Sequence, residues 1–254
     1  MRSERLSRPL AWCLAAALIL GAAACGETAS YPTRMIRRAV ALAITCKDLT
    51  GAPVALTDCR ASEHTLTGWV ADADQDSVAI VDLESGAHTD TDTFVPGYTA
   101  LGVGHDLVAI RALPTSEAVF ALLRRPREVV RIDVADRTIV RQALPCAPEG
   151  LVVVPVGAWA PDLLITCPDL PGILRVPLEN FGSHDPATLA RLELAGSPRF
   201  AALAPDGSVI YVSHLHHPVL DRVDLATGVS ERIGLTTACA DGLDNDNDGL
   251  ADAL

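Results

Sequence analysis

The chain has 254 residues, of which 49% are apolar and 20% are charged, and its formal net charge is −12. This apolar content is enough to bury a core, so the composition excludes an intrinsically disordered chain. The basic residues are nearly all arginine, and Lys47 is the only lysine. Because no polybasic stretch is present to neutralise phosphates, the sequence argues against a nucleic-acid partner.

The first 25 residues have the pattern of an export signal. The apolar run from Leu10 to Leu20 is too short to span a bilayer, and it follows three arginines, Arg2, Arg5 and Arg8. Small residues then lead directly to Cys25, and this ending resembles a bacterial lipoprotein signal. The run Ala22-Ala23-Ala24 also fits an ordinary cleavage site, which leaves export without a lipid as the alternative.

The lipoprotein resemblance implies a membrane anchor. Cys25 would carry the lipid, residues 1–25 would form the signal peptide, and residues 26–37 would form a polar tether. The residue after the cysteine is Gly26 and not aspartate, which in such lipoproteins implies the outer membrane. We therefore expect an outer-membrane lipoprotein on the periplasmic or the cell-surface side.

Cys13 lies in the signal peptide and Cys25 would carry the lipid, which leaves five other cysteines. An exported protein meets an oxidising compartment, where cysteines form disulfides. Proximity in sequence pairs Cys46 with Cys59 and Cys146 with Cys167, and it leaves Cys239 without a partner. No C-x-x-C motif occurs, so the cysteines do not indicate redox or haem chemistry.

Four segments share an alternating apolar pattern that ends in a turn. They are SVAIVDLESG from Ser77, EVVRIDVADR from Glu128, GILRVPLENF from Gly172 and VLDRVDLATG from Val219. When the segments are aligned on residues 82, 133, 177 and 224, the repeat spacings are 51, 44 and 47 residues. Spacings of this size are typical of propeller blades and not of helical repeats.

Other apolar runs complete each repeat. A second strand is predicted around residues 70, 121, 165 and 212, and a strand before it at residues 107–110, 151–154 and 200–203. TIVRQAL (138–144) and ATLARLEL (187–194) supply fourth strands. In the first repeat AVALAITC (39–46) is a candidate innermost strand, followed by an insertion that a Cys46–Cys59 bridge would tighten. Each repeat is therefore expected to form a four-stranded sheet.

The segment LAPDGSVIYVSHLHHPVLDRVDLATG (203–228) resembles a YVTN-type β-propeller repeat. The resemblance covers residues 67–235, with Pro177 in place of the usual aspartate in the third repeat. It implies an all-β fold, a β-propeller of about four blades over residues 38–235. Four blades either close a small ring or form part of a larger one.

The last residues, 236–254, resemble the calcium loops of thrombospondin type 3 and dockerin-like repeats, including those of large exported myxobacterial proteins. In DNDNDGLAD the alternating aspartates converge on one centre, Gly249 permits the sharp turn, and a carbonyl adds a further oxygen. The predicted calcium ligands are Asp244, Asp246, Asp248, the Leu250 carbonyl and Asp252. The alternative is a solvated acidic tail.

Two features of a complete calcium loop are missing. Position 12, which usually holds a bidentate acid, would be residue 255, and Cys239 has no second cysteine. We therefore expect the loop to be truncated, and the truncated loop to bind calcium only weakly.

The loops between second and third strands are expected on one polar face of the propeller. They read DADQDS (72–77), RRPR (124–127), CPDLP (167–171) and SHLHHP (213–218). Three sets of side chains on this face could bind a ligand. A transition metal would fit His214, His216 and His217, and calcium would fit Asp72, Asp74 and Asp76. An anion would fit Arg124, Arg125 and Arg127. For each set the alternative is a solvated or structural role.

No G-x-S-x-G, Walker A or H-E-x-x-H motif occurs, so the sequence does not favour an enzyme. The leading hypothesis is a lipid-anchored β-propeller that serves as a binding or scaffold module at the cell envelope. Its partner would be a protein or a small molecule on the propeller face. The alternative is a propeller enzyme, lactonase-like or a metal-dependent hydrolase, that uses the loop from His214 to His217.

Overall fold

The computed structural model describes residues 36–60, 62–91, 99–155, 162–194, 196–215 and 217–234. The predicted signal peptide, Cys25, nearly all of the tether and the calcium loop lie outside these residues. Within the described ranges, no helix has both the length and the apolar character needed to cross a membrane.

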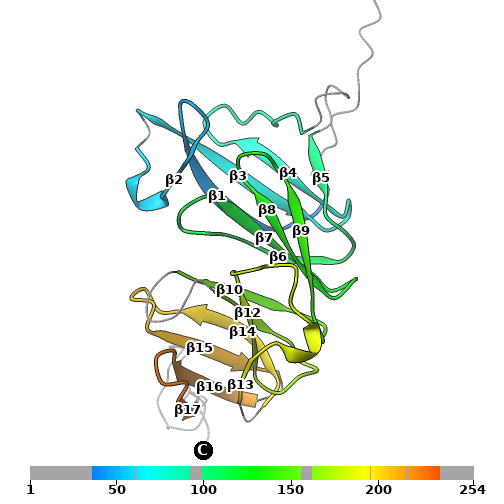
Figure 1. Ribbon diagram of the computed structural model, residues 1–254, viewed down its shortest axis with the longest axis vertical. Helices are drawn as coiled ribbons and strands as arrows, with labels where there is room; N and C mark the ends of the chain where they lie inside the picture. The colour runs from blue at the N-terminus through cyan, green and yellow to red at the C-terminus, as the bar shows by residue number, and fades with distance from the viewer. Residues whose placement is uncertain are drawn as a thin grey trace, which may run out of the picture.

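The described chain forms four antiparallel sheets (Figure 1). Sheet 1 has the strand order β2-β1-β3-β4-β5. Its strands are β1 (Ala39–Asp48), β2 (Pro53–Val54), β3 (His64–Asp72), β4 (Ser77–Asp82) and β5 (Ala100–Gly102), with the 3₁₀ turn η1 (Leu56–Asp58) between β2 and β3. The segment at 39–46 is thus the inner strand of the first sheet, as the sequence suggests.

The other three sheets have four strands each, in sequence order. Sheet 2 contains β6 (Leu107–Ala112), β7 (Ala118–Leu123), β8 (Glu128–Asp133) and β9 (Ile139–Ala143). Sheet 3 contains β10 (Gly150–Val154), β11 (Asp162–Thr166), β12 (Ile173–Pro177) and β13 (Arg191–Leu192), with η2 (Pro186–Thr188) before β13. Sheet 4 contains β14 (Pro198–Leu203), β15 (Val209–His214), β16 (His217–Asp224) and β17 (Ser230–Gly234).

The fourth strand of sheet 3 is shorter than the sequence predicts. Only Arg191 and Leu192 of the segment 187–194 pair with β12. The preceding residues form η2 instead, because Pro186 has no N–H to donate to a ladder and the Asp185 side chain accepts a hydrogen bond from the Ala187 N–H.

Consecutive sheets pack face to face through buried apolar clusters, one at each of the three junctions. The inner strands β1, β6, β10 and β14 are neighbours in that order. This is the arrangement of four blades of a β-propeller, and it confirms the all-β fold and the four repeats. Among the described residues, no buried cluster joins sheet 4 back to sheet 1.

The repeated turn between third and fourth strands explains the spacing of the anchors. The Asp82 carboxylate accepts hydrogen bonds from the backbone N–H groups of Glu84 and Ser85, and Asp224 does the same for Thr227. Gly86 and Gly228 follow with φ of 70° and 71°, a conformation in which a Cβ would be strained. An aspartate four residues before glycine therefore ends each of these strands.

Two disulfides are present, Cys46–Cys59 and Cys146–Cys167. These are the two pairs that proximity in the sequence suggests. The first joins β1 to the residue after η1 and holds the insertion against sheet 1, and the second lies in the buried cluster between sheets 2 and 3.

Candidate ligand-binding face

A charged pocket lies where the inner strands begin, on the side of the propeller that carries the β3–β4 and β7–β8 loops. Its volume is about 300 Å³. All four sheets contribute to its lining, which consists of Arg38, Val40, Ala73, Asp106, Leu107, Val108, Arg124, Glu149, Arg199 and Phe200. Two of the four loops expected on one polar face thus contribute to the pocket, through Ala73 and Arg124.

Glu149 is at the centre of the ionic contacts in this pocket. Its Oε1 lies 3.4 Å from a guanidinium nitrogen of Arg124, and its Oε2 lies 3.2 Å from Nε of Arg199. Arg124 also lies 3.6 Å from Asp106. Two carboxylates thus hold the guanidinium groups of Arg124 and Arg199 in place, which lowers the entropic cost of presenting them to a ligand.

One rim of the pocket is apolar. The guanidinium of Arg199 lies over the Phe200 ring, 5.0 Å from its centroid. A second pocket of about 320 Å³ continues along the inner strands, where Val40, Leu42 and Leu151 are among its lining residues. The site therefore combines fixed cations with an apolar wall.

The three aspartates that fitted a calcium loop have separate partners. The Asp72 carboxylate accepts hydrogen bonds from the N–H groups of Arg37, Arg38 and Asp74. Asp74 pairs with Arg38 at 2.9 Å, and Asp76 lies 2.5 Å from Nδ1 of His105. Asp72 thus fixes the chain just before β1, and the arrangement gives no support to a shared cation.

Burial alone would raise the pKa of Asp72, but the N–H groups that point at its carboxylate outweigh this effect and hold the pKa below its ordinary value. The same contacts should stabilise the fold. We expect Asp72→Ala to lower the free energy of unfolding by about 2 kcal/mol at neutral pH, because three hydrogen bonds to a charged acceptor are lost. Urea unfolding measures this change.

The effect should depend on pH with a defined sign. Because folding lowers the pKa of Asp72, its contribution is complete above the unfolded pKa of about 3.9 and is lost as the pH falls through the folded pKa. The gap between the natural protein and Asp72→Ala should therefore close in acid. Asp74→Ala is the control, because its ion pair with Arg38 is largely exposed and should contribute little. A gap that stays constant down to about pH 2 would contradict this assignment.

The histidine loop is arranged differently from the metal site that its sequence fits. His214 is the last residue of β15, its side chain is buried, and its Nε2 lies 2.9 Å from Asp221. Asp221 also accepts a hydrogen bond from Nε of Arg232. His217 is exposed at the start of β16, and His216 lies outside the described residues. The described histidines therefore lend no support to the hydrolase alternative.

The other two arginines of the predicted anion site, Arg125 and Arg127, have separate partners. Arg125 lies 3.7 Å from Asp106 near the pocket, whereas Arg127 makes a long contact with the Pro145 carbonyl. Only Arg124 of the three lines the pocket.

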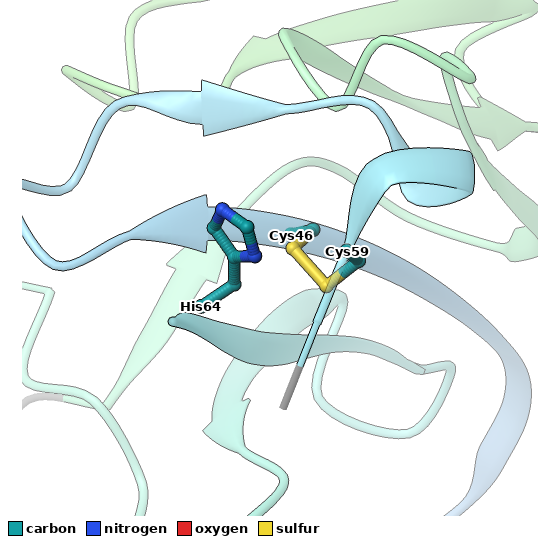
Figure 2. A group of neighbouring side chains, drawn as sticks. All are labelled: Cys46, Cys59 and His64. Carbon is teal, nitrogen blue, oxygen red and sulfur yellow. A yellow bond between two sulfur atoms is a disulfide. The ribbon is translucent and has the colours of Figure 1, made fainter. Parts of the chain in front are cut away.

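The described residues contain two groups of side chains with the composition of a metal site, and each includes a disulfide. Figure 2 shows the first, in which His64 lies beside the Cys46–Cys59 bridge. Nδ1 of His64 accepts a hydrogen bond from the Arg60 N–H. The second group adds Asp169 to Cys146 and Cys167. Because sulfurs in a disulfide are not thiolates, both groups are bridges with a polar neighbour.

Sequence reasoning missed most of the pocket. Arg38, Asp106 and Glu149 each stand just before the first residue of an inner strand, and Arg199 is the second residue of β14. A charged residue at the start of every innermost strand was the available signal.

Comparison with solved structures supports the fold. Hydrazine synthase of Kuenenia stuttgartiensis matches with a TM-score of 0.56 and 13% identity, over 81% of this chain and 51% of that chain. Dihydro-heme d1 dehydrogenase NirN, solved in complex with DHE, matches with a TM-score of 0.50 and 14% identity, over 82% and 47% of the two chains. At such identities the likeness shows a propeller fold alone. The chain spans about half the length of these proteins.

Comparisons at the level of sequence add no family: no family model and no curated protein matches the chain.

Proposed function

We propose that this chain is a lipid-anchored β-propeller of the YVTN type that serves as a binding module at the cell envelope. One observation carries the binding role: residues from four sheets surround a single pocket that contains three guanidinium groups. The anchor at Cys25, the outer-membrane location and calcium in the loop from Asp244 to Asp252 are parts of the same proposal, and they rest on the sequence motifs.

The chemistry of the pocket suggests a small polyhydroxylated acid. Three arginines line the pocket: Arg38 pairs with Asp74, and Arg124 and Arg199 are held by Asp106 and Glu149. A guanidinium binds a carboxylate through two parallel hydrogen bonds, and the carboxylates accept hydrogen bonds from hydroxyl groups. The exposed Phe200 ring and Val40 supply the apolar contact that a sugar ring makes with its site.

Galacturonate and galactose are matched probes, because they differ only in the carboxylate. In isothermal titration calorimetry we expect galacturonate to bind at least about tenfold more tightly than galactose, since one charge-assisted contact contributes about 1.5–3 kcal/mol. Arg199→Ala should remove this preference. Arg191→Ala is the control, because Arg191 pairs with Glu193 on β13 and does not line the pocket.

Three results would contradict the proposal: no binding of either sugar, equal affinity for both, or a preference for galacturonate that persists in Arg199→Ala. High salt should weaken galacturonate binding more than galactose binding, because only the former depends on charge.

A further inference from the structure

Within the described part of the chain, one face of sheet 1 and one face of sheet 4 have no other sheet packed on them. Sheet 1 packs on sheet 2 through one side, and its other side carries Leu42 and Ile44 of β1 with Val70 of β3 and Leu83 after β4; we call this face 1. The register supports one surface, because Leu42 pairs with Val70 and Ile44 pairs with Gly68. A Cβ on Gly68 would touch Leu42 and Leu83, so these side chains lie together.

Sheet 4 has a similar uncovered side. Ile210, Val212 and Val223 point toward sheet 3. The alternate residues point away from it, and they include Ala202, Tyr211, Leu220 and Ile233, which we call face 4. Ala202 pairs with Tyr211, and Leu220 pairs with Ile233, so one continuous surface extends from β14 to β17.

Exposed apolar residues concentrate on these two faces. Of the eleven large hydrophobic residues that are exposed in the described chain, Val40 and Phe200 line the pocket, and five of the other nine belong to face 1 or face 4. Leu42 on face 1 is 50% exposed and Tyr211 on face 4 is 38% exposed. Contiguous apolar surface of this kind marks an interaction site, whereas single exposed residues are ordinary.

The repeat shows which surface each face fits. Trp69, Phe120 and Leu164 occupy one repeat position, adjacent to the aligned residues 70, 121, 165 and 212, and each is buried against the following sheet. Tyr211 holds the same position in sheet 4 and is 38% exposed. Conversely Ala121, Ile165 and Val212 face the preceding sheet, and Val70 is their equivalent on face 1. Face 4 therefore corresponds to the side of a sheet that packs on the following sheet, and face 1 to the side that packs on the preceding sheet. The molecule already contains three junctions between two such sides.

We propose that a second copy of this chain covers both faces, with face 4 of each copy on face 1 of the other. Four sheets from each copy then close one ring, and both copies bury their exposed apolar faces. Such a pair has twofold symmetry and leaves no face open for further growth. The ion pair between Arg222 and Glu231 on face 4 suits the polar rim of such a junction.

Sedimentation velocity of the purified full chain tests the proposal. The natural protein should be a dimer, and Leu42→Glu on face 1 or Tyr211→Glu on face 4 should each raise the dimer dissociation constant at least about 100-fold, because both junctions of the ring receive a buried charge. Leu49→Glu is the control: Leu49 is 83% exposed in a turn outside both faces, so this variant should remain a dimer. Far-UV circular dichroism checks that every variant is folded.

An equimolar mixture of Leu42→Glu and Tyr211→Glu identifies which faces meet. If face 4 meets face 1, a mixed pair contains one junction without any substitution, and dimers reappear on mixing. If either single variant remains a dimer, the pairing of face 4 with face 1 is wrong, because the dimer then joins two identical faces or forms through another surface. A natural protein that stays monomeric overturns the proposal and assigns the two faces to further sheets or to another protein.

Discussion

Removal of either disulfide should lower the free energy of unfolding by about 3 kcal/mol in the loop-entropy model. The bridges join cysteines 13 and 21 residues apart, so each restricts a loop of moderate length in the unfolded chain. Cys46, Cys146 and Cys167 are buried, and the second bridge also packs in the cluster between sheets 2 and 3. Loss of both bridges should therefore reduce the stability of the domain by about 6 kcal/mol, an amount comparable to the whole stability of many domains.

Paired substitutions separate the two contributions. Cys46→Ala with Cys59→Ala, and Cys146→Ala with Cys167→Ala, are compared with the natural protein by urea unfolding. The Cys146 pair should have the larger effect, because its loop is longer and its sulfurs contact the core. A reductant should destabilise the natural protein and leave the variant without either bridge unchanged. Equal midpoints for the natural protein and both paired variants would refute the structural role of the bridges.

The third strands β4, β8 and β16 were predictable because two signals agree at each of them. In sheet 2, Val119, Ala121 and Leu123 form one buried face of β7, and the strand after it ends at Asp133, whose carboxylate caps the turn. The alternation of apolar residues shows which side of a strand is buried, and the aspartate shows where the strand ends. The repeat of 44 to 51 residues can therefore be recognised in a single sequence.

The pocket was not predictable in the same way. Arg38, Asp106, Glu149 and Arg199 are separated by 43 to 68 residues, and only the curvature of the sheets brings them together. The segment SHLHHP looked like an open loop, but β15 extends to His214 and pairs it with His217, which turns the imidazole toward Asp221.

The position of Trp69 at the first junction leads to the other large prediction. Its side chain is fully buried in the cluster between the two sheets, which includes Ala43 and Ala71 of sheet 1 and Val119 and Ile132 of sheet 2. Its Nε1 donates a hydrogen bond of 2.8 Å to Oγ1 of Thr45, which is also buried. Trp69→Ala would open a cavity and leave this hydroxyl without its donor, so we expect the free energy of unfolding to fall by about 3–5 kcal/mol.

Two further variants separate packing from the hydrogen bond at this junction. Trp69→Phe keeps an aromatic ring but loses the donor, and it should cost less than half as much as Trp69→Ala. Thr45→Val replaces the acceptor by a group of the same shape. In the Trp69→Phe background it should have little effect, because neither partner is then left unpaired. A Trp69→Ala variant as stable as the natural protein would mean that sheets 1 and 2 do not pack through this residue.

Because Trp69 is the sheet 1 equivalent of Tyr211, the same substitution at Tyr211 in the Leu42→Glu monomer should cost much less, since that position is covered only when a second copy is present.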